Sequence, residues 1–314
     1  MNDDESALYR VSAHKHESNG FRDNPFLGRK DTNGRDETSV RLRAQFVAND
    51  DLDVNVAAMY MDVDNGYDAF ALDNSYTMLS DKPGKDAQES AGMSLRADWR
   101  GAAAGTLTSI TSFADSQVDF SFDADWGNED SWSPVTYDYV SLTDRKRTTV
   151  SQEFRFVADS WLLGAYALHL SEDLGRADQG DYYDPFYDFA DTLDYAFASE
   201  FESTNVAFFG QADWALGERT RLSAGIRLEH RTTDYSDTDG IDEDPSETMW
   251  GGEISLQRDV SADVLTYMTL SRGYKAGGFN LGPVPAGFRE FGNEILWTLE
   301  GGIKSVLADG RLRL

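Results

Sequence analysis

A stretch between residues 178 and 202 alternates carboxylates with aromatic rings, a combination that could recognise a ligand. The carboxylates are Asp178, Asp181, Asp184, Asp188, Asp191, Asp194, Glu200 and Glu202, and the rings are Tyr182, Tyr183, Phe186, Tyr187, Phe189, Tyr195, Phe197 and Phe201. Aromatic faces provide contact area at low entropy cost and attract cations. A metal chelate, a cationic group or a sugar ring would therefore suit this surface. We take Tyr182, Tyr183, Phe186 and Tyr187 as a candidate substrate loop; the alternative is a solvated loop that packs its own aromatic side chains.

A second acidic stretch, 237–244, invites a calcium interpretation because hard cations take several carboxylate oxygens. Its spacing departs from an EF-hand: Gly240 falls at the fourth position instead of the sixth, and no Glu stands at the twelfth. We expect an exposed loop, disordered by the repulsion of its own charges.

Other chemistry-bearing residues do not combine into a site. His14 and His16 would share one face of a strand, as a metal pair requires, but no third ligand completes the set. The four histidines offer no Ser-His-Asp arrangement, and the stretch 273–278 lacks the order of a phosphate-binding loop. The sequence therefore predicts no enzyme, no metal site and no cofactor.

The net charge and the absence of cysteine exclude several classes of partner and of chemistry. The 314 residues carry 28 Lys and Arg against 56 Asp and Glu, a formal net charge of −28, and there is no cysteine. A charge this negative opposes nucleic-acid binding, in which Lys and Arg release counterions from phosphates. The absence of cysteine removes disulfides and thiolate chemistry together. No apolar run approaches the roughly 20 residues of a spanning helix.

The elements that must position these residues are strands, because hydrophobic residues recur with period two. One face is apolar and the other carries charge in the stretches 40–48, 52–60, 206–214 and 222–228. In such an alternation Glu153 and Arg155 share the charged face of one strand, as do Arg227 and Glu229 of another. Most segments extend over about 10 to 13 residues, where a tilted membrane strand needs roughly 9 to 11.

The connections between strands alternate in length along the chain. Short turns are expected at 48–51, 100–105, 158–160, 216–220, 259–263 and 307–310, and long loops at 17–36, 64–91, 116–146, 173–202, 234–247 and 274–293. About thirteen strands lie between them. Tight turns at one end and extended loops at the other are typical of an outer-membrane barrel. Trp99, Trp161, Trp214 and Trp250 would then lie near strand ends, in the aromatic girdles.

One segment carries a family resemblance. Residues 265–280, LTYMTLSRGYKAGGFN, resemble a stretch of the TonB-dependent outer-membrane receptors, in which a strand ends and a glycine-rich loop follows. The matching residues are Arg272, Gly273, Tyr274, Lys275, Gly277, Gly278, Phe279 and Asn280. We expect the three glycines to adopt backbone conformations closed to other residues. Further matches, in the family's order, are 20–21, 24–29, 151–157, 161–166, 294–304 and 306–314.

The resemblance also has departures and limits. Asn293 precedes Glu294 where the family usually has a Pro-Glu pair, and Ala276 stands where Ser is common. Family members are similar in having a signal peptide, a TonB box, an amino-terminal plug and a 22-stranded barrel. We expect residues 1–314 to be one partial β-barrel domain, about 13 of 22 antiparallel transmembrane strands, without plug, signal peptide or carboxy-terminal strands.

The resemblance implies a function. A member of this family is a multi-pass barrel in the outer membrane of a Gram-negative bacterium that takes up a large, scarce substrate, most often a ferric siderophore or other iron complex. Its partners would be the TonB complex through the plug, an iron chelate and outer-membrane lipid. Two other classes stay open: a secreted acidic β-rich protein, such as a carbohydrate-active enzyme or an adhesin, and a passive porin.

Overall fold

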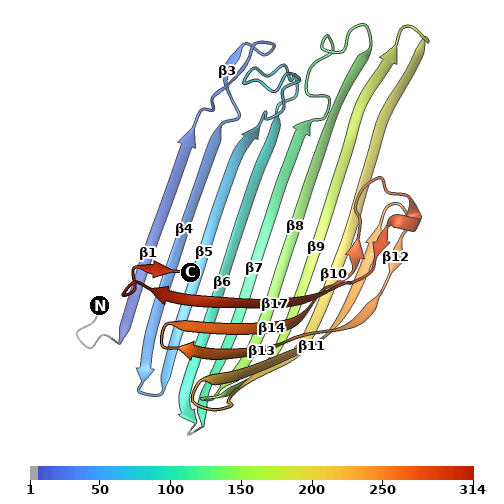
Figure 1. Ribbon diagram of the computed structural model, residues 1–314. Coiled ribbons are helices and arrows are strands. Elements are labelled where there is room, and N and C mark those ends of the chain that lie inside the picture. Colours follow the sequence, from blue (N-terminus) through green and yellow to red (C-terminus); the bar gives the residue numbers. More distant parts are fainter. Residues whose placement is uncertain (1–5, 103) are drawn as a thin grey trace.

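The computed structural model describes residues 6–102 and 104–314, whose long strands form one antiparallel sheet (Figure 1). Two small sheets, β2–β3 and β15–β16, lie outside it. Each major strand pairs with the next along the chain. The strands are β1 (Ala7–Ser18), β4 (Arg35–Asn49), β5 (Leu52–Tyr67), β6 (Gly84–Ala102), β7 (Gly105–Asp123), β8 (Thr136–Val157), β9 (Trp161–Asp184), β10 (Phe189–Ala215), β11 (Thr220–Asp237), β13 (Ser246–Ser261), β14 (Val264–Lys275), β17 (Glu294–Leu307) and β18 (Leu312–Arg313). The fold is all-β and the sheet has 14 strands with β12, as the period-two pattern predicts.

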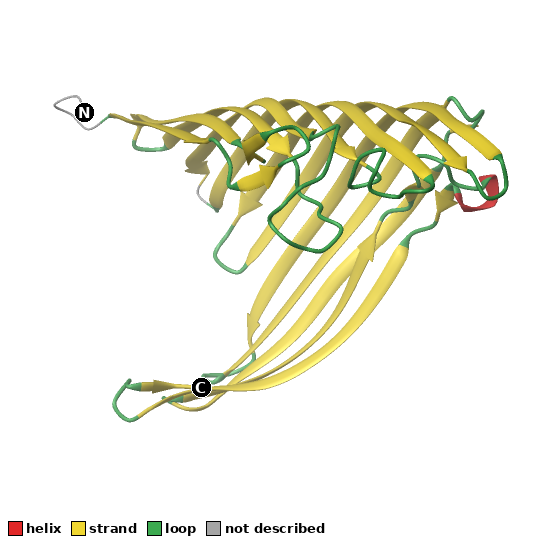
Figure 2. Ribbon diagram, turned by 90° about the horizontal axis from the view of Figure 1, so that it is seen from above, coloured by secondary structure: helices red, strands yellow, loops and turns green. Residues whose placement is uncertain are grey.

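Short elements fill the connections at the upper end. These are β2 (Arg22–Asn24), β3 (Arg29–Thr32), β12 (Asp242–Glu243), β15 (Gly278–Phe279), β16 (Glu290–Phe291) and the 3-10 turn η1 (Ala286–Phe288). All six predicted short turns are confirmed at the opposite end. Seen from above, the sheet curves into an open trough (Figure 2). β1 is the strand at one edge of the sheet and β18 is the strand at the other.

Strand length was predicted wrongly. Major strands other than the terminal β18 extend from 12 residues in β1 to 27 in β10, so most exceed the expected 10 to 13. The largest error concerns the predicted loop 173–202, which is a β-hairpin of β9 and β10 with a turn at 185–188. Its many carboxylates suggested a loop, but a strand whose two faces both meet water can carry them.

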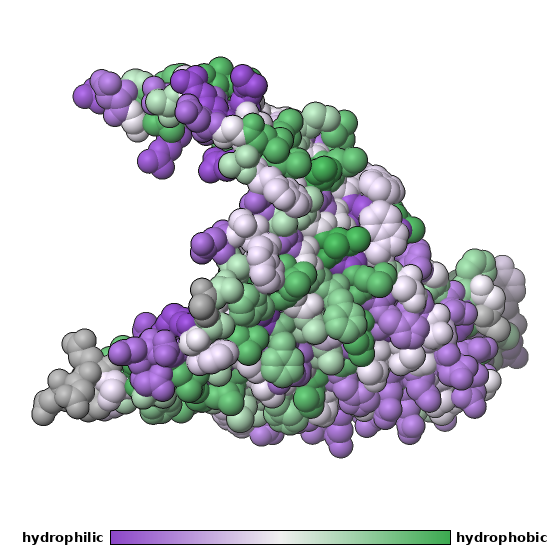
Figure 3. Space-filling view, turned by 90° about the horizontal axis from the view of Figure 1, so that it is seen from below, coloured by the Kyte–Doolittle hydropathy of each residue, from purple (hydrophilic) through white to green (hydrophobic). Residues whose placement is uncertain are grey.

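The sheet has an apolar and a polar face. On β10, Val206, Phe208 and Trp214 share the apolar face, and Phe208 is 65% exposed. The polar face is concave, because its side chains reach past intervening strands: the Arg227 guanidinium on β11 lies 5.3 Å from the Tyr166 ring on β9. Seen from below, hydrophobic residues gather in one broad field, bordered on one side by hydrophilic residues (Figure 3).

The convex face changes character along the strands. Near the short turns it is apolar, whereas the upper extensions present carboxylates on the same face. The register places Asp62, Asp64, Asp119, Asp144, Asp173, Glu200, Glu202 and Asp234 there. Such a boundary is expected where a lipid-facing band ends and water begins. Within the described residues, no helix is long and apolar enough to cross a membrane.

Tryptophans lie at both borders of the apolar band. Trp99, Trp161 and Trp214 lie at the ends of β6, β9 and β10 beside the short turns, as predicted. Trp250 instead lies within β13, opposite Leu228. It contacts Trp297 of β17, with ring centroids 5.9 Å apart. This pair occupies the upper border rather than a strand end.

Candidate ligand-facing wall

The four residues of the predicted substrate loop lie in three places. Tyr182, on β9, is opposite Tyr137 of β8 and points to the concave side. Tyr183 follows it and therefore points to the convex side. Phe186 and Tyr187 lie in the hairpin turn and are 76% and 83% exposed. The structure thus brings one of the four to the concave wall.

Tyr182 belongs to an aromatic cluster that the sequence analysis did not assemble. Its ring centroid lies 6.5 Å from that of Tyr137 and 6.2 Å from that of Phe189. Tyr137 contacts Tyr139 at 4.6 Å and Trp132 at 5.7 Å. These residues come from the β7–β8 loop and three consecutive strands, so only the hairpin register could have placed them together.

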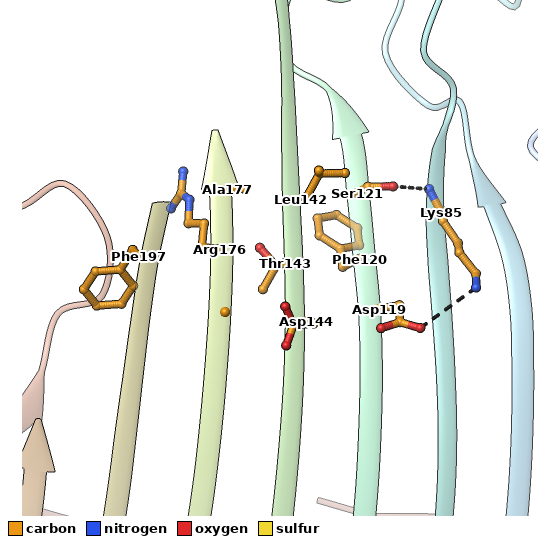
Figure 4. A pocket seen from close by; sticks show the side chains of 11 residues that line it. Lys85, Asp119, Phe120, Ser121, Leu142, Thr143, Asp144, Arg176, Ala177 and Phe197 are labelled. Carbon is orange, nitrogen blue, oxygen red and sulfur yellow. Dashed lines mark hydrogen bonds and ion pairs between the residues drawn. The ribbon is translucent and has the colours of Figure 1, made fainter. Parts of the chain in front are cut away.

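Arginines lie beside aromatic rings lower on the same wall. Arg176 of β9 is directly opposite Phe197 of β10. Both adjoin an open hollow of about 510 Å³, which is lined mostly by residues that point to the convex side, such as Asp119 and Asp144 (Figure 4). The Arg176 Nε lies 2.9 Å from Asp178 Oδ2. One strand further, Arg145 and Arg147 share a single carboxylate, Glu172, so this part of the wall has more guanidinium groups than carboxylates.

Figure 4 also shows the convex side of this stretch. Lys85 on β6, Asp119 on β7 and Asp144 on β8 follow one another across the sheet, and the Lys85 Nζ lies 4.0 Å from Asp119 Oδ2. Asp119 and Asp144 are directly opposite each other in register. The convex extension is therefore acidic where the concave wall carries arginine.

A buried arginine anchors the acidic loop 237–244. Arg289, 2% exposed, has its Nη2 2.5 Å from Asp239 Oδ2 and its Nε 3.3 Å from Asp237 Oδ2. The Asp237 carboxylate also accepts hydrogen bonds from the Asp239 and Ile241 amides. The expectation of a disordered, self-repelling loop was wrong, because Arg289 from the β15–β16 region pairs with Asp237 and Asp239 and backbone amides bind the Asp237 carboxylate.

Two aromatic contacts extend this anchor. The Arg289 guanidinium lies 5.2 Å from the Phe197 ring centroid, and Tyr235 stacks on Phe279 with centroids 4.0 Å apart. The Tyr235 hydroxyl donates to Asp237 at 2.8 Å. Burial, and then this carboxylate, raise the pKa of Tyr235 above its usual range. The phenol therefore stays protonated and acts as a donor.

The family motif contributes residues to both faces. On the concave side, the Tyr274 hydroxyl donates to Glu229 Oε2 at 2.8 Å and accepts from Arg227 Nε at 3.2 Å. Arg227 and Glu229 pair at 2.8 Å, so their predicted place on one face is confirmed. Arg272 lies on the convex face, its guanidinium 4.2 Å from the Trp250 ring centroid.

The predicted reason for the motif glycines was wrong. Gly273, Gly277 and Gly278 are absent from the residues with positive φ. Gly277 and Gly278 instead allow close packing, since an added Cβ would lie 2.6 Å from the Phe291 carbonyl oxygen and 2.9 Å from the Phe291 ring. The remaining motif residues make ordinary contacts: Lys275 lies 4.0 Å from Glu294, and the Asn280 amide donates to the Phe288 carbonyl.

A buried polar cluster in the upper loops was not foreseen. Asp123 and Asp125, at the end of β7, are 6% and 2% exposed, and Asp123 Oδ2 has no hydrogen-bond partner in the described chain. Burial raises the pKa of Asp123 to about 7, and the charge of Asp125 adds to this, whereas the nearby Ser80 hydroxyl lowers it. No sequence motif marks this cluster, because its members come from separate loops.

The predicted histidine pair does share one face of β1: His14 is opposite Ser39 and His16 is opposite Glu37. Among residues 6–102 and 104–314, no group of three or more His, Cys, Asp or Glu side chains is arranged to hold a metal ion.

Comparison with known proteins identifies the architecture. A family described as TonB dependent receptor-like, beta-barrel matches residues 3–314. Among solved structures, the chain is similar to the ferric yersiniabactin uptake receptor FyuA from Yersinia pestis, with a TM-score of 0.79, 16% identity, and coverage of 98% of this chain and 49% of that one.

Two further structures have the same fold. The ferric preacinetobactin receptor BauA from Acinetobacter baumannii matches with a TM-score of 0.64 and 11% identity over 97% of this chain and 48% of its own. The ferric-catecholate import receptor Fiu from E. coli K12, in its open form, matches with a TM-score of 0.66 and 10% identity over 98% and 54%. This chain thus spans about half the length of these receptors.

Proposed function

The chain belongs to the TonB-dependent receptor β-barrel family, and we therefore propose that it forms part of an outer-membrane receptor for uptake of a ferric siderophore or another iron complex. The solved structures with this fold include receptors for ferric yersiniabactin, ferric preacinetobactin and ferric catecholates. We place the apolar convex band in the lipid and the concave wall in the lumen.

One observation carries the substrate proposal. The concave wall above the apolar band combines aromatic rings with arginines, and one pair of arginines shares a single carboxylate. Rings supply flat contact area, and guanidinium groups bind carboxylate or phenolate oxygens with directed hydrogen bonds. A chelate with an aromatic or anionic periphery fits such a wall.

We propose that uptake requires TonB and the proton motive force, delivered through a plug and TonB box outside residues 1–314. The test is accumulation of ⁵⁵Fe-loaded siderophores by cells that carry the intact receptor. A proton ionophore should stop accumulation and leave surface binding unchanged. Accumulation that continues at the same rate would indicate a passive porin.

Adjacent tyrosines provide a matched test of the binding wall. Tyr182→Ala removes a ring from the concave side and should weaken binding of the chelate roughly five- to tenfold. Tyr183→Ala removes the same ring from the convex side and should leave Kd unchanged. We include Phe186 and Tyr187 in the proposed site as an exposed entry, where Tyr187→Ala should slow association. Equal affinities for Tyr182→Ala and Tyr183→Ala would contradict the assignment of the wall.

A further inference from the structure

Three arginines on the first two long strands lack the partners that other arginines of the concave wall have. Arg10 lies on β1, and Arg41 and Arg43 lie on β4. None of them makes an ion pair or side-chain hydrogen bond with the described residues. By contrast, guanidinium groups further along the wall are each paired with a carboxylate, such as Arg155 with Glu153 and Arg231 with Glu247.

The register places these charges close together. Arg10 and Arg43 are directly opposite in the β1–β4 ladder, and Arg41 is opposite Ser12. Residues i and i+2 share a face, so all three side chains lie on one side of the sheet. That side is the concave one, because Arg43 is in register with Ala57 and then Ser94, whereas the alternate residues Leu42 and Ala44 belong to the apolar face.

Among the residues that the structure describes, no carboxylate in the hollow beside these arginines is free to neutralise them. The three arginines line an open hollow of about 860 Å³ together with Gln45 and Asn55. Its two carboxylates are already engaged: Asp53 accepts from Arg100 at 2.6 Å, and Asp98 from Arg96 at 2.8 Å. The three arginines do not lack partners because the chain has few carboxylates, since it contains 56 Asp and Glu residues.

Like charges directly opposite each other in a ladder destabilise the sheet. An anion that bridges such an arginine pair removes this repulsion, and two guanidinium groups present several N–H donors for this purpose. We propose that Arg10, Arg41 and Arg43 form an anion-binding strip on the concave wall, which takes a ligand with two or more carboxylate or phosphate groups.

The strip extends along the wall rather than forming a closed pocket. Beyond Ser12, the same face of β1 carries His14 and His16 toward the upper end. All three arginines are exposed. A ligand would be held loosely by exchangeable charge contacts, which suits passage along the wall more than tight capture. This assignment rests on the proposed function in one respect: the concave wall must face an aqueous lumen.

Chemical labelling in the intact receptor can test the strip without any uptake measurement. Ser12→Cys introduces a thiol between the arginines, and Ser112→Cys is the matched control on the concave face of β7, in register with Ser94 and Ser151. Each variant is treated with a sulfonate-bearing and a trimethylammonium-bearing methanethiosulfonate, and the ratio of their rates is measured. This chain has no cysteine of its own to interfere.

We expect the anionic reagent to be favoured at position 12 by roughly tenfold relative to position 112, because a local positive potential concentrates anions. Adding Arg41→Gln and Arg43→Gln should remove the preference at position 12 and leave position 112 unchanged. Millimolar citrate should slow labelling at position 12 alone. Rates at position 112 report whether each variant is folded.

Two outcomes would overturn the proposal. Equal rate ratios at positions 12 and 112 would mean that the arginines create no anion-selective surface. Protection of position 12 from both reagents, with position 112 reactive, would mean that a protein segment covers the strip. Neither result depends on iron uptake, so failure of the strip and failure of the proposed transport function are distinguishable.

Discussion

At the scale of single residues, the side chains with the most constrained chemistry lie in the upper loops. Asp123 accepts hydrogen bonds from the Asp125 and Trp126 amides through Oδ1, while its other oxygen is buried without a partner. Asp125 Oδ2 accepts from the Tyr139 amide at 2.7 Å. The two carboxyl groups thus close the loop onto β8.

This arrangement predicts that the loop loosens as pH rises. The pKa of Asp123 is raised to about 7 in the folded state. The stability that this group contributes is therefore fully present at pH values below the ordinary pKa of Asp, and it is lost as pH rises from there through about 7. Amide exchange of residues 124–135, corrected for intrinsic rates, should show less protection at pH 8 than at pH 5. Asp123→Asn, which cannot ionise, should show equal protection at both; a persistent pH dependence in that variant would assign the effect to another group.

A glycine on β13 leaves room for the motif tyrosine. A Cβ at Gly251 would lie 3.0 Å from Tyr274 Cε1 and 3.0 Å from the Arg272 carbonyl oxygen, whereas one at Gly225 on β11 would have its nearest contact at 3.5 Å. Gly251→Ala should therefore displace the ring from Glu229 and cost roughly 1 to 3 kcal/mol of unfolding free energy. Gly225→Ala is the control, measured by the same denaturant titration of the intact receptor in detergent. Similar losses for both would mean that the tyrosine contact is not the cause.

At the scale of elements, periodicity determines what the sequence can predict. Alternation located the strands and all six short turns, because a period of two is a local property. It could not tell where β9 ends and β10 begins, because Asp and Tyr also alternate there and the extension has water on both faces. Cross-strand neighbours such as Tyr137 and Tyr182 depend on register, which no single segment contains.

The convex face of β11 crosses the inferred boundary between lipid and water, which predicts that an arginine costs far more stability below the boundary than above it. Ile226 is 61% exposed in the apolar band, and Asp234 lies on the same face of the extension. Ile226→Arg should cost about 2 to 4 kcal/mol, as expected for an arginine near a bilayer midplane. Asp234→Arg should change stability by less than about 0.5 kcal/mol. Urea-dependent unfolding in lipid vesicles would measure both, and equal tolerance would contradict a lipid-facing band.

At the scale of the whole molecule, the chain forms a single curved layer without a conventional core. The largest fully buried side chains, including Tyr235, Met78 and Asn24, lie in the upper part, where loops fold over the strands. In a bilayer, apolar contacts on the convex face are made by lipid, and closure must satisfy every strand edge. The one-layer architecture could be predicted from alternation, but the packing of the upper loops could not.

The 14-stranded sheet has β1 at one edge and β18 at the other, and these two edge strands do not pair with each other. Residues 1–314 produced alone should therefore associate through these edges, because unpaired backbone groups recruit further strands. Analytical ultracentrifugation in detergent should find oligomers that grow with protein concentration. A stable monomer without detergent would contradict the membrane assignment.

The strictly sequential order of the major strands has a consequence for how the sheet is made. Every long strand after β1 pairs with the long strand before it, so each new ladder closes only the chain segment between two neighbours. The entropy lost in closing a loop grows with loop length, and folding slows as paired residues become more distant in sequence. Assembly can therefore advance one hairpin at a time, and the tight turns, such as 158–160, are the connections that cost least to close.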